Sequence, residues 1–295
     1  MVAVHGWASR RRAGALRLRP QEEVLVQPRG RQRALLAANL AVMALLLGVP
    51  ILSLVERSLA VSGGGYGLGT WRTLSSSRRG STLFVSPLAA LGNSLVYAAV
   101  ATAIALVVGG LAAFAVARRT TWAARGFDAL LMLPLGTSAV TVGFGFLVAL
   151  DRPPLDLRGS PLLVPVAQAL VATPLVVRSL VPVLRSVDLR LKEAAATLGA
   201  SPWRVLREVE LPLVGRALLV GAGFAFAVSL GEFGATVFLA RPDRPTLPVA
   251  IVRLLGQPGA QSLGHAMAMS TILVVVTATA VLLIERHRSG EVGEL

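Results

Sequence analysis

The sequence contains no cysteine among its 295 residues, which excludes disulfide bonds, thiolate metal sites and cysteine nucleophiles. Histidine is nearly as rare. His5, His265 and His287 lack the spacing of metal ligands, so we interpret them as surface or interfacial residues. Lysine occurs once, as Lys192, directly after Leu-Arg-Leu. Because a P-loop requires a lysine after a glycine-rich turn, we predict that this chain is not an enzyme and holds no cofactor, and that any ATP is bound by another chain.

Charged residues are also scarce, at 15% of the chain, whereas 54% of the residues are hydrophobic and the mean hydropathy is +0.69. These values lie outside the range of an ordinary soluble domain and predict a protein embedded in a lipid bilayer. The net charge of +14 is compatible with a polyanionic partner. However, nucleic-acid-binding proteins do not usually interrupt their basic residues with long uncharged apolar runs, so we do not expect nucleic acid as a partner.

Six apolar segments are long enough to cross a hydrocarbon core of about 30 Å as helices. We therefore predict an all-α polytopic membrane protein with six transmembrane helices. Pro134 and Gly136 in the third segment and Pro174 in the fourth predict broken or kinked helices that face protein or a cavity, because lipid cannot satisfy freed backbone groups. The predicted spans cover approximately 35–54, 91–117, 129–150, 161–181, 217–240 and 264–284.

The distribution of basic residues predicts the orientation of these spans. With both termini inside, 20 of the 29 arginine and lysine residues flank inner ends and 9 flank outer ends. This bias agrees with the positive-inside rule and predicts cytoplasmic N- and C-termini. No small-residue cleavage site follows the first span, so we interpret that span as a retained helix rather than a signal peptide.

The polar stretch over 188–212, DLRLKEAAATLGASPWRVLREVELP, joins the fourth and fifth spans on the predicted cytoplasmic side. Asp188 is suited to cap a helix that Gly199 would end in a left-handed conformation. Ser201 followed by Pro202 is suited to begin a second helix. The pattern predicts a helix, a turn and a helix, and an amphipathic loop lying on the membrane surface is the other interpretation.

This stretch resembles the EAA signature of permease subunits of type I binding-protein-dependent ABC importers, with valine where the family usually has isoleucine. The resemblance implies a cytoplasmic loop that couples to an ATPase. The residues to which it assigns this role are Glu193, Ala194, Ala195, Gly199, Trp203, Val209, Leu211 and Pro212. It also implies a location in the bacterial plasma (inner) membrane and three protein partners: ATP-binding-cassette ATPase subunits, a second permease subunit of the same or a related kind, and an external substrate-binding protein.

A second motif, SLGEFGA over 229–235, resembles the permeases of ferric iron, thiamine, molybdate and sulfate importers. Its carboxylate, Glu232, would cost about 2.5–3.5 kcal/mol in the middle of a span, so we expect it to face the permease interior. One interpretation places it on the translocation path, where it would favour ferric iron or thiamine. The other gives it a structural hydrogen bond to Thr137 or Thr141. The residues assigned to the path are Glu232, Gly231, Gly234, Thr137 and Thr141.

The resulting organisation is a basic cytoplasmic tail over 1–33, a first helix with an external loop over 34–87, a permease core over 88–288 and a C-terminal tail over 289–295. An oxyanion such as molybdate or sulfate is the alternative substrate. A less favoured alternative is an ion-coupled secondary carrier, which typically places several ionisable groups in the membrane, whereas only Glu232 lies well inside a predicted span.

Overall fold

The computed structural model describes residues 29–60, 65–76, 85–118, 121–150, 152, 156–157 and 159–289. Most of the predicted basic tail, the C-terminal tail from residue 290 and parts of the first two external loops lie outside these residues. The described part is helical and has one isolated β-bridge, between Ala60 and Tyr66. The chain divides into two units, 1–53 and 54–295, which are described separately.

The first unit contains most of helix α3 (Arg31–Leu59), which includes the predicted first span and ends in the second unit. Its length and apolar composition are sufficient to cross a membrane. Pro50 lies inside this helix. The Ser53 hydroxyl donates a hydrogen bond of 2.8 Å to the Pro50 carbonyl oxygen, so it supplies that oxygen with a local donor.

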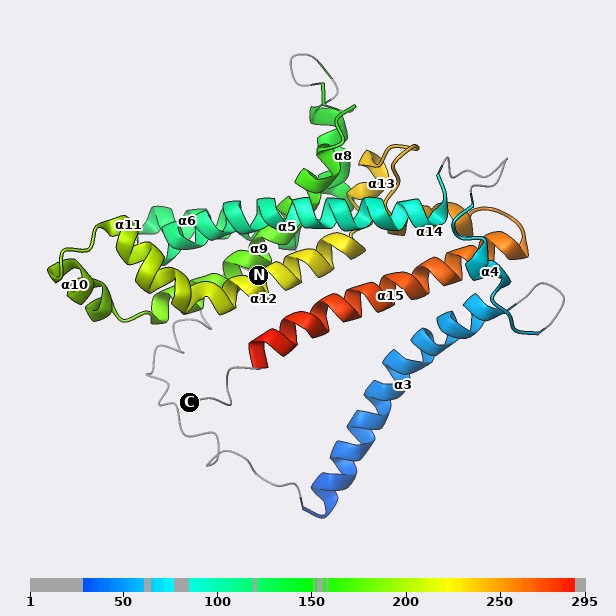
Figure 1. The fold of residues 1–295 in the computed structure, drawn as a ribbon, viewed down its shortest axis with the longest axis horizontal. Helices are drawn as coiled ribbons and strands as arrows, with labels where there is room; N and C mark the ends of the chain where they lie inside the picture. Colours follow the sequence, from blue (N-terminus) through cyan, green and yellow to red (C-terminus); the bar gives the residue numbers. More distant parts are fainter. Residues whose placement is uncertain are drawn as a thin grey trace. The chain divides into compact units, whose positions relative to one another are not determined.

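The core of the second unit consists of α5 (Pro87–Ala117), α9 (Leu163–Ser186) and α12 (Leu211–Gly231), which pack side by side (Figure 1). Small residues allow these helices to approach closely. A β-carbon added at Gly109 would lie 3.0 Å from Cβ of Val176, and one added at Gly221 would lie 3.5 Å from Cα of Val176. The core is therefore built mainly from alanine and valine, as expected for helices that associate through small faces.

Two further helices complete the second unit: α14 (Leu247–Leu255) lies at the opposite end from the polar loop, and α15 (Ala260–Ser289) begins at that end and runs back along α12 (Figure 1). The short α14 is largely buried against α15 and α5. Ser94 Oγ accepts a hydrogen bond of 2.6 Å from the Leu247 N–H, and Asn93 Nδ2 donates one of 3.1 Å to the Pro245 carbonyl oxygen. The start of α5 is thus bonded directly to the start of α14.

The third predicted span is broken, as proline and glycine in this segment indicate. The predicted span, 129–150, contains the end of α6 (Trp122–Leu131), all of α7 (Leu133–Gly136) and all of α8 (Ala139–Ala149). These helices are separated at Met132 and at residues 137–138. In Figure 1, α8 turns away from the direction of α5 and lies beside α13 (Thr236–Leu239). For this reason five helical segments of the described residues, rather than six, are continuous enough to cross a membrane alone.

Candidate functional site

The predicted helix–turn–helix is present as a hairpin of α10 (Leu189–Thr197) and α11 (Pro202–Val205). Asp188 Oδ1 accepts a 3.0 Å hydrogen bond from the Arg190 N–H, and Ser201 Oγ accepts one of 3.4 Å from the Arg204 N–H. Gly199 has a φ of +82°, a left-handed conformation that favours glycine. Both caps and the glycine turn are confirmed.

The turn at Gly199 is a Schellman motif. The Gly199 N–H donates to the Ala196 carbonyl oxygen, and the Ala200 N–H donates to the Ala195 carbonyl oxygen, each at 3.0 Å. A β-carbon added at Gly199 would meet no atom of this chain within 4 Å. A side chain at this position would therefore cost free energy through the backbone conformation rather than through collision between the two helices.

The hairpin presents apolar side chains on its outside. Trp203 is 69% exposed and Leu198 is 89% exposed, and Leu191 is about half exposed. Glu193, Ala194 and Gly199 are also exposed, and Ala195 is half-buried. We call Leu191, Leu198, Gly199 and Trp203 the hairpin surface. Such a set of apolar side chains on a rigidly capped turn is typical of a protein interaction site.

The second half of the loop continues from α11 into α12 through a π-helical turn, η1 (Leu206–Glu210). The Leu211 N–H bonds to the Leu206 carbonyl oxygen, five residues back. Pro212 explains this turn, since its nitrogen carries no hydrogen and its ring would clash with the Glu208 carbonyl in a regular α-helix. Among the motif residues here, Val209 is half-buried whereas Leu211 and Pro212 are exposed.

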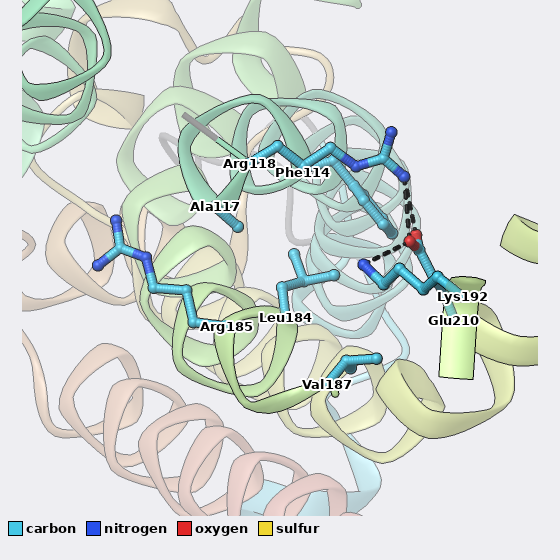
Figure 2. Close-up of a pocket in the computed structure, with 8 residues that line it drawn as sticks. All are labelled: Phe114, Ala117, Arg118, Leu184, Arg185, Val187, Lys192 and Glu210. Atoms are coloured by element: carbon cyan, nitrogen blue, oxygen red, sulfur yellow. Dashed lines mark hydrogen bonds and ion pairs between the residues drawn. The ribbon is translucent and has the colours of Figure 1, made fainter. Parts of the chain in front are cut away.

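The π-helical turn carries a buried carboxylate, Glu210, whose side chain is only 2% exposed. Its oxygens accept hydrogen bonds of 3.1 and 3.0 Å from Arg118 Nη2 at the end of α5. Lys192 Nζ on α10 lies 2.7 Å from Glu210 Oε1. Figure 2 shows the two cations converging on the carboxylate from different elements. We call Arg118, Lys192 and Glu210 the charge triad.

A cavity of about 280 Å³ lies beside the charge triad. Phe114, Leu184 and Val187 form apolar walls, and the Arg118 guanidinium lies 5.7 Å from the centre of the Phe114 ring. Arg185 also lines the cavity, but in Figure 2 its guanidinium points away from Glu210. The cavity therefore has a charged side at the triad and an apolar side at the ends of α5 and α9.

The sequence interpretation missed Glu210, which was not among the motif residues assigned to coupling. Two signals could have indicated it. An acidic residue between Val209 and Leu211 at the start of an apolar span must be paired, and Pro212 predicts an irregular turn at this point. The pairing with Arg118, 92 residues away, requires the structure.

Glu232 ends α12 instead of lying in the middle of a helix that continues to residue 240. Its backbone is extended, and its carboxylate accepts hydrogen bonds from the Ala235 N–H at 2.7 Å, the Thr236 N–H at 3.0 Å and the Thr236 hydroxyl. The prediction that Glu232 bonds to Thr137 or Thr141 was wrong. Glu232 instead caps the first turn of α13, a local role that hydropathy alone does not reveal.

The other residues assigned to the path lie around the same junction. Gly234 packs closely on α8, because a β-carbon there would lie 3.0 Å from Cβ of Ala139, whereas one at Gly231 would meet no atom within 4 Å. Thr137 and Thr141 are exposed, and the Thr137 hydroxyl donates to the Leu133 carbonyl oxygen at 2.9 Å. The structure thus places Gly234 against α8, the helix that contains Thr141 and follows Thr137, without bonding either threonine to Glu232.

Within the part of the chain that the structure describes, no cluster of three or more histidine, aspartate or glutamate residues could hold a metal ion. The loops at the other end of the second unit carry their own ion pair. Arg241 donates to Asp243 at 3.0 Å and to the Gly159 carbonyl oxygen at 2.9 Å. The Arg241 hydrogen bond lowers the pKa of the Asp243 carboxyl. These contacts join the loops after α8 and α13.

Comparison with known proteins gives consistent similarities. Residues 105–287 match the family described as binding-protein-dependent transport system inner membrane component. A putative 2-aminoethylphosphonate transport system permease from Salmonella paratyphi A is 30% identical over 67% of this chain and 73% of its own length. The molybdenum transport system permease of Escherichia coli K12 is 35% identical over 50% of this chain and 73% of its own length.

A solved structure has the same fold. A chain in the crystal structure of a bacterial ABC transporter involved in the import of the acidic polysaccharide alginate superimposes with a TM-score of 0.66. The match covers 88% of this chain and 95% of that chain, at 16% sequence identity. This similarity therefore concerns the fold alone.

Proposed function

The chain belongs to the family of binding-protein-dependent transport system inner membrane components, and on that basis we propose that it is the transmembrane subunit of an ATP-driven importer. In this proposal it forms the translocation path together with a second permease subunit. Cytoplasmic ATPase subunits bind and hydrolyse ATP, and an external binding protein delivers the substrate. The chain itself contributes the path and the coupling loop.

The observation that carries this proposal is the hairpin surface. Capped helix ends and the Schellman turn hold Leu198 and Trp203 in fixed positions, where both side chains are mostly exposed. A rigid apolar projection at the end of a helix bundle suits insertion into a groove of a partner protein. We assign that partner to the ATPase.

We expect Trp203→Ala to weaken association with the ATPase by about 30-fold, because buried tryptophans at interfaces contribute about 2 kcal/mol or more. The amount of ATPase that co-purifies with the permease measures association. ATP-dependent uptake into proteoliposomes, with radiolabelled molybdate and 2-aminoethylphosphonate as separate probes, measures function.

Trp122→Ala is the matched control. Trp122 begins α6 at the same end of the second unit, outside the hairpin, and is 82% exposed. We expect this variant to retain the ATPase. Equal loss in both variants would point to a general effect of removing exposed tryptophan, and full retention in Trp203→Ala would refute the hairpin surface as the docking site.

The proposed orientation places the hairpin in the cytoplasm and the loops around Gly159 outside. Because the chain contains no cysteine, a single introduced cysteine reports this orientation without labelling at any other position of the chain. A membrane-impermeant maleimide should label Gly159→Cys in intact cells and Ser201→Cys only after permeabilisation. The reverse labelling pattern would overturn both the orientation and ATPase docking by the hairpin.

For the substrate, we propose an oxyanion. This choice is supported by the two relatives, which are named for molybdenum and 2-aminoethylphosphonate transport. Molybdenum occurs in water as the molybdate oxyanion, and 2-aminoethylphosphonate carries a negatively charged phosphonate group. The prediction of ferric iron or thiamine gains no support from these relatives. Its physical basis is also weaker, because the Glu232 carboxylate is occupied by the hydrogen bonds of α13.

A further inference from the structure

The charge triad joins the hairpin to α5, a helix that is not adjacent to it in the sequence. The hairpin follows α9 after residues 187–188 and leads through η1 directly into α12. By contrast, α5 precedes it by about 70 residues of chain, and Arg118 of α5 reaches Glu210 across 92 positions. Motion of the hairpin would thus pass to α9 and α12 through the backbone, and the triad gives it a connection to α5.

The connection has one buried member, the Glu210 carboxylate, whereas the side chains of its two cations are 59% exposed for Arg118 and 23% exposed for Lys192. A carboxylate withdrawn from water is stable only while cations compensate its charge, and removing a partner is costly. Glu210 is buried and receives one cation from α5 and one from α10. Separation of α5 or α10 from Glu210 would leave the buried negative charge without one of its two cations. Movement of α5, α10 and η1 together is therefore favoured.

The opposite end of α5 is also bonded. Ser94 and Asn93 bind the residues that begin α14. With 31 residues, α5 is about 46 Å long, which is enough to extend from one side of a membrane to the other. A displacement received at Arg118 can therefore reach α14 through one continuous helix.

We propose that Glu210 is a positioning residue that couples the hairpin to α5, so that displacement of the hairpin by the ATPase moves α5, α9 and α12 as one body. This inference rests on the proposed importer function and adds a mechanical step to it. The π-helical turn imposed by Pro212 directs the carboxylate inward, whereas the exposed hairpin surface faces the partner. The loop thereby separates docking from transmission.

The first test measures coupling in the complex of permease, ATPase and binding protein. We expect Glu210→Gln to retain the ATPase and its basal hydrolysis but to transport about tenfold less substrate per ATP, a typical size for coupling between sites. Arg118→Gln removes the cation that joins Glu210 to α5 and leaves Lys192 in place, and we expect the same reduction of transport per ATP. Normal transport per ATP in Arg118→Gln would show that Glu210 does not act through α5.

Glu208→Gln is the matched control, two residues away in the same turn. Glu208 pairs with Arg204 at 3.1 Å, but both side chains are more than half exposed. Exposed pairs contribute little, so we expect normal transport per ATP in this variant. Equal defects in Glu208→Gln and Glu210→Gln, or a normal transport ratio in Glu210→Gln, would overturn the proposal.

The second test does not depend on uptake. Spin labels on cysteines introduced at Ala115 of α5 and Ala196 of α10 report the distance between these elements with and without a non-hydrolysable ATP analogue. In the complex that retains Glu210, we expect the distance between the two labels to be the same with and without the analogue. In Glu210→Gln, we expect the distribution of this distance to broaden or shift. A change of this distance in the complex that retains Glu210 would refute coupled motion. Failure of the unmutated chain to bind any ATPase would instead refute the proposed function.

Discussion

Gly143→Ala is expected to destabilise the second unit by about 3 kcal/mol, at the upper end of the range for overpacked sites. A β-carbon at Gly143 of α8 would lie 2.5 Å from Cα of Ala235 and 2.6 Å from its carbonyl oxygen. Backbone atoms cannot rotate away as a side chain can. The new methyl group must therefore separate α8 from the segment that joins α12 to α13, and thermal unfolding of the purified complex measures the loss.

Gly145→Ala tests whether the collision is the cause. Gly145 lies on the same helix, but a β-carbon there would meet no atom of this chain within 4 Å. Alanine in a helix interior is favoured over glycine by about 0.5–1 kcal/mol, so this variant should match or exceed the stability of the parent protein. If both substitutions lowered the melting temperature equally, close contact with Ala235 would not explain the effect.

The same junction limits what α8 can do during transport. Phe144 and Phe238 meet edge to face, with ring centres 6.1 Å apart, and Gly234 also touches α8. These contacts bind α8 to α13, and Phe146 and Leu147 of α8 also pack against a buried cluster that includes residues of α5 and α9. The broken third span and the end of the fifth therefore form one packed element, and its stability depends on the two glycines at the contact.

Hydropathy predicted the helical segments because lipid imposes a long apolar run on every continuous span. Pro134 and Gly136 predicted the break in the third span, since proline and glycine are strong local signals. The hairpin was equally predictable, because Asp188, Gly199 and Ser201 act on backbone groups within a few residues of themselves. Structural features that depend on residues close together in the sequence, such as helix caps and turns, could thus be predicted.

The two buried carboxylates were less predictable for a physical reason. Glu210 is compensated by cations that come from elsewhere in the chain, and no local pattern specifies Arg118 as a partner. Glu232 was recognised as needing compensation, but the prediction placed it inside a continuous helix. In that geometry its oxygens could not reach the N–H groups three and four residues ahead, which become available only because α12 ends at Gly231.

This geometry determines the result expected from Glu232→Gln. In the parent protein one carboxylate oxygen accepts from the Ala235 N–H, and the other accepts from both the N–H and the hydroxyl of Thr236. Glutamine has only one acceptor oxygen, so in either orientation its NH₂ group faces a backbone donor. We expect a loss of about 1–3 kcal/mol, as for a buried group left without its partner, visible as a lower melting temperature of the purified complex.

Thr236→Val supplies the comparison, because it removes the hydroxyl donor and keeps the backbone donor, and its cost should be nearer to about 1 kcal/mol. If Glu232 acts by capping α13, uptake per folded complex in Glu232→Gln should stay close to that of the parent protein, since the proposed oxyanion substrate has no use for a carboxylate on its path. An unchanged melting temperature together with strongly reduced uptake would contradict the capping role. That outcome would instead support the interpretation in which the charge of Glu232 acts on the translocation path and favours a cation.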